Sequence, residues 1–214
     1  MNSEDRATLS DNPFDESADA LTTDILVLGL GNVLWADEGF GIRAAEALNE
    51  RWRFPPSVRV MDGGTQGIFL LPWVRNAKRL LIFDAIDFGL LPATLKVIRG
   101  DDVPRFMGAK KVSMHQAGFQ EVLSSADLAG DLPDELVLIG VQPELLDDYG
   151  GSLRPSVKAQ IDPAIELGLN ILSEWDITPR RRNKSRADDD NIGPTALDMR
   201  DYENDRPAIN GETP

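Results

Sequence analysis

The stretch that decides the fold runs from Asp24 to Arg43 and reads DILVLGLGNVLWADEGFGIR. It begins with an apolar run, Ile25 to Leu28, which stops at Gly29 and Gly31. A short continuous apolar run bounded by glycines is typical of a strand buried on both faces of a sheet. After a loop, apolar residues recur with helical spacing from Asp37 onward. Strand, glycine turn and helix predict the first unit of an open α/β sheet, whose ligands bind beyond the carboxyl ends of the strands.

The same alternation of buried strands and helices continues to residue 175. Further apolar runs predict strands at 58–61, 79–84, 93–98 and 135–141, and helices at 66–76, 113–125 and 155–175. The link between the third and fourth strands is shorter than the dozen or so residues that a parallel crossover needs. We therefore predict a three-layer α/β/α domain with a mostly parallel five-stranded sheet and one antiparallel edge strand.

Acidic residues outnumber basic ones, with 36 Asp and Glu against 22 Lys and Arg. Both ends of the chain are highly charged and lack an apolar period. We therefore predict a disordered acidic arm over residues 1–22, the α/β/α domain over 23–175, and a flexible charged tail over 176–214. The region 23–175 alone carries a net charge of −7. Such an acidic surface disfavours nucleic acid and anionic membranes as partners, and it is compatible with a basic protein or a cation.

Cysteine is absent, which excludes disulfides, a thiolate nucleophile and a thiolate metal site. No apolar stretch reaches the roughly 20 residues that a membrane helix needs. The acidic beginning of the chain also lacks the apolar core of a signal peptide. We expect a soluble, cytoplasmic protein without membrane insertion.

Three side chains suited to metal binding stand near the carboxyl ends of predicted strands. Glu38 follows the first strand, Asp84 ends the third, and His115, the only histidine, begins the helix before the fifth. If the main strands are parallel, all three fall at the same edge of the sheet. Two carboxylates and one imidazole suit a borderline divalent ion such as zinc, nickel or iron, and three ligands leave coordination positions open.

Each of these residues also has a purely structural interpretation. Glu38 could complement the positive end of the helix dipole. Asp84 could cap or brace a loop, and a single histidine near a helix start is more often a hydrogen-bonded structural residue. Spacing along the chain alone does not decide between these alternatives.

The turn Asp62-Gly63-Gly64-Thr65 ends the second strand at the same edge. Glycines suit a tight turn from strand to helix. Asp62, Gly63 and Gly64 are candidate substrate-binding residues; the alternative is a turn in which Asp62 or Thr65 caps helix amides. No Ser-His-Asp triad can be assembled from the sequence, so the catalytic residue stays unassigned.

Gly29-Leu30-Gly31 after a strand is also similar to the start of a dinucleotide-binding fingerprint. The match is incomplete, because Leu34 stands where the third glycine is expected. Asp62 also lies further along the chain than the usual ribose-binding acid. The simpler interpretation is steric: one glycine makes the sharp turn, and the other lets the backbone pass close to a neighbour.

Taken together, these motifs resemble the nickel–iron hydrogenase maturation endopeptidases. The resemblance covers about residues 24–175, and the two ends have no counterpart in the family's minimal form. It rests on segments that occur in the family's order, namely Ile25–Asn32 with Asp37–Gly41, Asp62–Thr65, Asp84–Ala85, Ser113–Gln116 and Gly140–Glu144.

The resemblance implies a single α/β/α domain with a twisted five-stranded sheet. It implies that the protein removes a short C-terminal extension from the hydrogenase large subunit once nickel has been inserted, with Glu38, Asp84 and His115 as metal ligands. The nickel would be carried by the substrate, so that no permanent metal is expected, and the partner would be the nickel-loaded large-subunit precursor. Two alternatives stay open: a non-catalytic nickel-sensing chaperone of the large subunit, and a dinucleotide-binding module.

Overall fold

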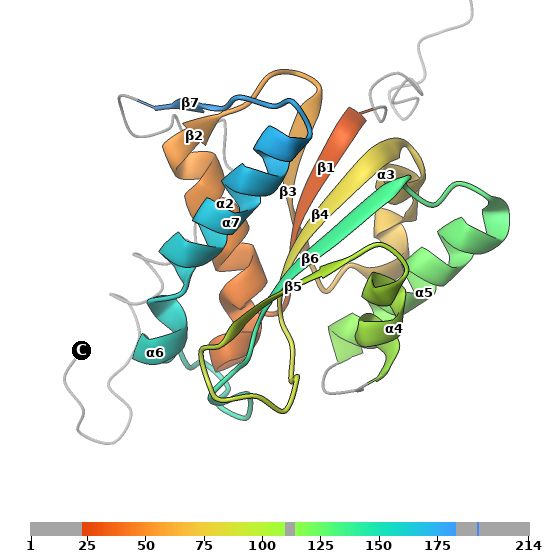
Figure 1. Ribbon diagram of the computed structural model, residues 1–214. Coiled ribbons are helices and arrows are strands. Elements are labelled where there is room, and N and C mark those ends of the chain that lie inside the picture. Colours follow the sequence, from red (N-terminus) through yellow and green to blue (C-terminus); the bar gives the residue numbers. More distant parts are fainter. Residues whose placement is uncertain (1–22, 110–113, 183–191, 193–214) are drawn as a thin grey trace, which may run out of the picture.

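The computed structural model describes residues 23–109, 114–182 and 192. Its main sheet has five strands in the order β3-β1-β4-β6-β5 (Figure 1). Neighbouring strands are parallel except for β5 and β6, which are antiparallel at one edge. The strands are β1 (Thr23–Leu30), β3 (Val58–Gly64), β4 (Ala77–Ala85), β5 (Leu95–Arg99) and β6 (Glu135–Val141). The predicted fold class, with its antiparallel edge strand, is confirmed.

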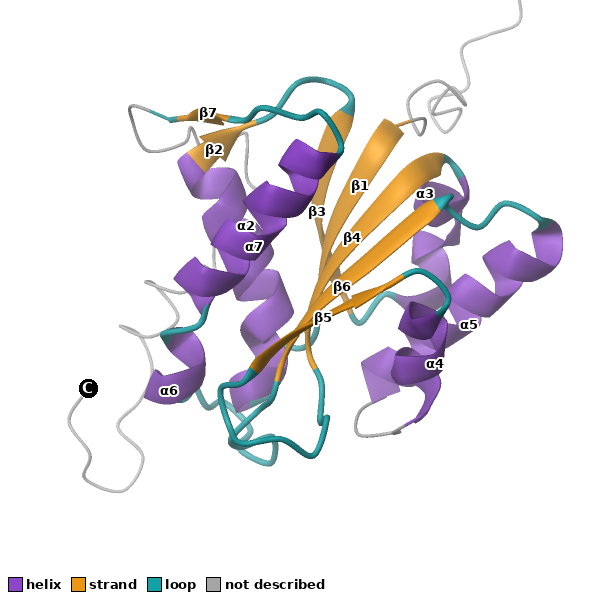
Figure 2. Ribbon diagram, viewed as in Figure 1, coloured by secondary structure: helices purple, strands orange, loops and turns teal. Residues whose placement is uncertain are grey.

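Helices cover both faces of this sheet, which gives three layers (Figure 2). On one face lie α2, α6 and α7, and on the other lie α3, α4 and α5. The helices are η1 (a 3-10 turn, Ala36–Gly39), α2 (Phe40–Arg51), η2 (a 3-10 turn, Gly67–Leu70), α3 (Leu71–Arg75), α4 (Asp102–Ala109), α5 (Met114–Ala129), α6 (Pro155–Lys158) and α7 (Ile161–Glu174). Over the described ranges, none of them combines the length and the apolar character needed to cross a bilayer.

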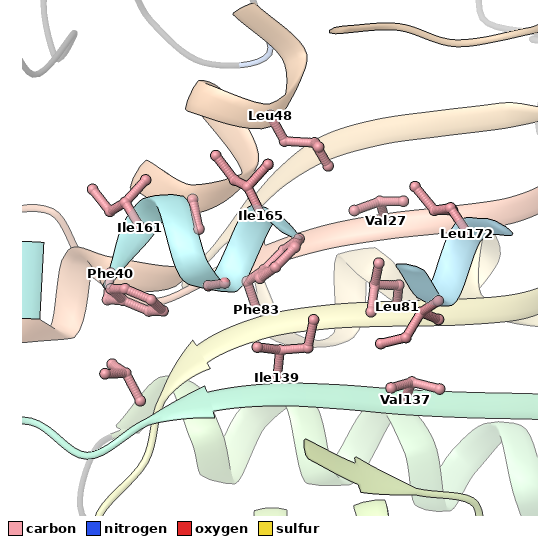
Figure 3. Packing of buried hydrophobic residues seen from close by; sticks show 14 of the residues in the cluster. Val27, Phe40, Leu48, Leu81, Phe83, Val137, Ile139, Ile161, Ile165 and Leu172 are labelled. Atoms are coloured by element: carbon pink, nitrogen blue, oxygen red, sulfur yellow. The ribbon is translucent and has the colours of Figure 1, made fainter. Parts of the chain in front are cut away.

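The two faces of the sheet have separate hydrophobic cores, supplied by alternate residues of the same strands. Leu81 and Phe83 of β4 belong to the core beneath α2 and α7, whereas Leu80 and Ile82 belong to the core on the opposite face. Figure 3 shows Phe83 beside Ile165 of α7. Burying a side chain of this size stabilises the fold by roughly 1.5–3 kcal/mol. Strands that are buried on both faces explain why continuous apolar runs predicted them.

The predicted helix over 155–175 is wrong in one respect, because the structure divides it into α6 and α7. The break falls just before Pro163, which lies in the first turn of α7. Proline has no amide hydrogen, and its ring clashes with the carbonyl four residues earlier, here that of Ala159. A continuous helix through both residues is therefore disfavoured.

A second, two-stranded sheet joins the end of α2 to a segment beyond α7. In it β2 (Trp52–Arg53) pairs antiparallel with β7 (Arg180–Arg181). The predicted tail at 176–214 therefore begins with residues that pair back onto the domain. The remainder of that tail, apart from residue 192, and the predicted arm over 1–22 lie outside the described residues.

The start of α2 lies directly against the ends of β1 and β4. A Cβ atom on Gly41 would stand 2.1 Å from the carbonyl oxygen of Phe83 and 2.3 Å from that of Leu30. A Cβ atom on Gly29 would stand 2.4 Å from the carbonyl oxygen of Gly41. Side chains are excluded from both positions, so the helix packs at backbone distance against the strand ends.

We predict that Gly41→Ala destabilises the protein by about 1–3 kcal/mol, because the added methyl group overpacks two backbone carbonyls. Gly118→Ala in α5 is the matched control: its Cβ would meet only the Cα of Gly67, at 3.4 Å, and alanine favours a helix by up to about 1 kcal/mol over glycine. Urea unfolding followed by circular dichroism measures both. Equal unfolding midpoints for the two variants would contradict the close packing described above.

Candidate functional site

Four loops extend from the carboxyl end of the main sheet, where an open α/β fold binds its ligands. They follow β1, β3, β4 and β6, and we call them the edge loops (residues 31–39, 65–70, 86–94 and 142–154). Figure 2 shows loops gathered around the lower end of the sheet.

Glu38 lies in η1, in the edge loop after β1, and is half-buried. Its amide donates a hydrogen bond to the carbonyl of Trp35 (2.9 Å), and its carbonyl accepts one from the amide of Asn32 (3.2 Å). Gly31 has φ +138°, and a Cβ there would stand 1.9 Å from the carbonyl oxygen of Glu38. The glycine therefore gives the turn and also lets Glu38 approach, as the steric interpretation predicted.

Asp37, the neighbour of Glu38, has a structural role that the sequence did not reveal. Its carboxylate is fully buried. One oxygen accepts hydrogen bonds from the amides of Glu144 and Leu145, both at 2.8 Å, and the other accepts from the amide of Arg154 at 2.7 Å. This single side chain ties the first edge loop to the last. Two adjacent acids gave no local signal to show which of them faces inward.

Asp84 is fully buried at the end of β4. One of its carboxylate oxygens accepts a hydrogen bond from the amide of Ala85 at 2.7 Å. Strand alternation puts Asp84 on the same face as Leu80 and Ile82. That face is the one covered by α5, whose first turn contains His115.

The N-terminal half of α5, which contains His115, lies at the same edge. A Cβ on Gly118 would stand 3.4 Å from the Cα of Gly67, in the edge loop after β3. The backbones of Glu38, Asp84 and His115 therefore come to one edge of the sheet, although the His115 side chain is outside the described residues. The described side chains alone contain no group of three His, Cys, Asp or Glu able to hold a metal ion. Convergence of the three side chains stays a prediction.

Asp62 lies near the end of β3, beside Gly29 of β1. Within the described part of the chain, its Oδ1 atom is buried and has no hydrogen-bond partner. Burial raises the pKa of this carboxyl group, and the Gly64 amide and the Arg43 guanidinium offset that effect only partly. Arg43 belongs to α2, so the charged neighbour of Asp62 lies on the face opposite to α5. A partly buried carboxyl group with a perturbed pKa at such an edge is a functional candidate.

Gln66 makes two hydrogen bonds that hold the turn after Asp62. The Gln66 amide donates to the carbonyl of Gly63, and its side-chain Nε2 donates to the carbonyl of Asp62, both at 3.1 Å. Gly64 has φ +45°, a left-handed conformation. A role of Asp62, Gly63 and Gly64 in substrate binding stays a prediction.

The geometry argues against the dinucleotide-binding alternative. The space beside Gly29 is filled by Gly41 and Ala45, and the space beside Gly31 is filled by the Glu38 carbonyl. In the dinucleotide fold these glycines let a pyrophosphate approach the backbone. Here the chain itself occupies that position.

Comparison with known families identifies the family. Residues 42–171 match the family model of the hydrogenase maturation proteases. This chain belongs to the hydrogenase maturation protease family. The resemblance inferred from the motifs is confirmed, and the chain is a hydrolase of the protease class.

Individual relatives give the same result. The hydrogenase expression/formation protein HoxM of Azotobacter vinelandii is 55% identical over 184 residues, which cover 86% of this chain and 87% of HoxM. The hydrogenase 2 maturation protease of Escherichia coli is 43% identical over 151 residues, or 70% and 91% of the two chains. The HoxM match is longer than the predicted 23–175 domain, so that likeness includes part of the terminal segments.

Solved structures show the shared fold. The hydrogenase maturating endopeptidase HybD of E. coli superimposes with a TM-score of 0.72 at 40% identity, covering 76% of this chain and all of HybD. The [NiFe] hydrogenase maturation protease HybD of Thermococcus kodakarensis gives a TM-score of 0.58 at 27% identity, covering 70% of this chain and 99% of that protein.

We predict that Asp62→Asn stabilises this maturation protease at neutral pH. The folded state raises the pKa of Asp62, so it binds this proton more tightly than the unfolded chain does. The stability that Asp62 contributes is therefore present below its ordinary pKa and is lost as the pH rises through the folded value. Asparagine keeps a hydrogen-bond acceptor and avoids burying a charge.

The check is urea unfolding of wild type and Asp62→Asn at several pH values from about 3.8 to neutral, with the exposed Asp147→Asn as control. The midpoint of Asp62→Asn should rise relative to wild type as the pH increases, and that of the control should not. A constant or falling difference for Asp62→Asn would show that burial of the charged form carries no penalty.

Proposed function

We propose that this protease is the endopeptidase that removes the C-terminal extension of a nickel–iron hydrogenase large subunit after nickel insertion. One observation carries the proposal: the carboxylate of Asp84 is buried on the face covered by α5, whose first turn holds the only histidine of the chain. Glu38 stands in the loop that follows the neighbouring strand β1. The family relationship supports the assignment, since the related protein of T. kodakarensis is described as a [NiFe] hydrogenase maturation protease.

In this proposal the nickel ion belongs to the substrate, and no resident metal is required. Glu38, Asp84 and His115 offer two oxygen ligands and one nitrogen ligand, a set that suits nickel. They would complete the coordination shell of an ion already held by the precursor. When a precursor without nickel binds, Glu38, Asp84 and His115 would be buried without a ligand to coordinate. This cost disfavours its binding. The site would thereby test whether nickel insertion is complete.

Hydrolysis requires that water add to the scissile carbonyl carbon and that the carbon–nitrogen bond break as the departing amine takes up a proton. The substrate's nickel can supply Lewis-acid activation of the carbonyl or of the water. The chain's own contribution is to orient the substrate, with Asp62, Gly63 and Gly64 at the end of β3 as candidate contacts. The absence of cysteine from the sequence agrees with attack by water without a thioester intermediate.

We predict that the purified protein cleaves the nickel-loaded precursor and leaves the nickel-free precursor intact. His115→Ala, Glu38→Gln and Asp84→Asn should each lower the cleavage rate about 100-fold or more, since loss of even a supporting partner of a metal ligand typically costs 10–100-fold. The exposed Glu121→Gln in α5 is the control and should cleave normally. Mass spectrometry of the released C-terminal peptide measures cleavage, and circular dichroism checks that each variant is folded.

Two outcomes would contradict this function. Equal cleavage of the nickel-loaded and nickel-free precursors would show that the protease does not recognise nickel. Tight binding of the loaded precursor without release of any peptide would instead indicate the non-catalytic chaperone.

A further inference from the structure

The exposed large apolar side chains concentrate on the edge loops. Seven such residues occur in the described part of the chain, and six of them belong to the edge loops. We call these six the apolar rim: Trp35, Ile68, Phe69, Leu90, Leu91 and Tyr149. The seventh, Leu128, lies near the end of α5, away from this edge. Apolar groups gathered around a functional edge indicate a binding surface, whereas a single exposed leucine needs no explanation.

The rim residues Trp35 and Tyr149 are held in place by backbone structure. The two residues form an antiparallel bridge, and their rings meet edge to face with centroids 5.3 Å apart. The amide of Gly150 donates to the carbonyl of Leu34 at 2.7 Å. This aromatic pair is therefore fixed by the same two edge loops that Asp37 ties together.

The remaining rim residues also lie on ordered loops. Gln142 accepts hydrogen bonds through its Oε1 atom from the amides of Phe88 (2.7 Å) and Leu90 (3.1 Å), which holds the loop carrying Leu90 and Leu91. Ile68 and Phe69 form part of η2. A rim held in position before binding loses little conformational entropy when a partner covers it.

The rim lies beside all three candidate nickel ligands. Trp35 is in the same edge loop as Glu38, and the carbonyl of Trp35 accepts a hydrogen bond from the amide of Glu38. Leu90 and Leu91 are in the edge loop that follows Asp84 and β4. Ile68 and Phe69 directly follow Gly67, and Gly118 in the N-terminal half of α5 lies against the backbone of Gly67. A chain lying across the rim would therefore pass the proposed cleavage site.

The charge of the edge loops indicates which partner fits. They contain five acids that are at least partly exposed, namely Glu38, Asp87, Glu144, Asp147 and Asp148, besides the buried Asp37. Their single base, Arg154, pairs with Asp148 at 3.1 Å. A surface that is both apolar and acidic favours a polypeptide with apolar side chains and an excess of Lys or Arg. It disfavours nucleic acid, and it disfavours a second copy of the chain docked edge to edge, because like charges would face each other.

We propose that the apolar rim docks the large-subunit precursor through a segment beside its scissile bond that carries apolar side chains and a net positive charge. This inference rests on the proposed function and adds how the substrate is recognised apart from its nickel. The rim supplies apolar contact area, and the acids of the edge loops select the charge of the bound segment. Recognition of the polypeptide and recognition of the metal are then separate contributions to specificity.

The double variant Phe69→Ser/Leu91→Ser tests the apolar contribution in the full chain, with Leu128→Ser as the matched control. Phe69, Leu91 and Leu128 are 78%, 81% and 91% exposed, so none of these changes opens a core cavity. With nickel-loaded precursor as substrate, the double variant should lower kcat/KM about tenfold or more through KM, with kcat within about twofold of wild type. The control should leave both constants unchanged.

The charge contribution is tested by Asp147→Lys against Asp127→Lys, since both aspartates are exposed and only Asp147 lies in an edge loop. Asp147→Lys should raise KM and reduce its dependence on salt, because screening weakens the attraction between the acidic loops and a basic segment. Asp127→Lys should behave as wild type.

These experiments distinguish failure of the docking surface from failure of the proposed function. If wild type neither binds nor cleaves the loaded precursor, the proposed function and the docking surface both fall. If wild type cleaves it and the rim variant cleaves equally well, the docking surface is overturned while the proposed function stands. If sedimentation velocity shows a wild-type dimer that the rim variant loses without a change in KM, the rim is an interface between copies of this chain and the proposal is wrong.

Discussion

The close packing of η1 and α2 against the ends of β1 and β4 is the constraint on which the site depends. Gly29, Gly31 and Gly41 leave no side chain between the strand ends and the loop that carries Glu38. Because β1 and β4 are neighbours, Glu38 is then fixed beside the strand that carries Asp84 near its end. A larger residue at any of the three glycines would push the loop away from the sheet. The glycines therefore serve to place the loop and need not bind a ligand themselves.

Hydrogen bonding at Asp37 completes this arrangement from the other side. Three backbone amides of the last edge loop point at one buried carboxylate, and they would be left without partners if it were removed. Charge-assisted bonds of this kind are roughly twice as strong as neutral ones. Asp62, by contrast, has a buried oxygen without a partner in the described residues. The carboxylate of Asp37 is thus fully hydrogen-bonded within the chain, whereas that of Asp62 has an oxygen without a partner among the described residues. This difference is the one expected between a structural and a functional group.

Much of this fold could be predicted from local sequence patterns. Apolar runs located the five strands, and the short link before β5 indicated its antiparallel direction. The division of the last helix at Pro163 was also predictable, because the rule behind it is local. Long-range pairing could not be predicted in this way, because the sequence around Arg180 does not indicate that Arg53 is its strand partner. The inward orientation of Asp37 was equally hidden, since the amides that fix it lie more than a hundred positions along the chain. The candidate nickel ligands were proposed because the fold class brings the ends of β1 and β4 and the start of α5 to one edge, and their convergence stays a prediction.

The central claim is that Glu38, Asp84 and His115 converge on one nickel ion carried by the substrate. The most direct measurement is a crystal structure of a cleavage-deficient variant that retains these three residues, bound to the nickel-loaded precursor, with anomalous data collected at the nickel absorption edge. The account predicts one nickel peak at the carboxyl edge of the sheet, with an oxygen of each acid and a nitrogen of His115 about 2.0–2.2 Å away, as for related borderline ions. A nickel ion coordinated by the precursor alone, with any of the three side chains turned away from it, would contradict the account.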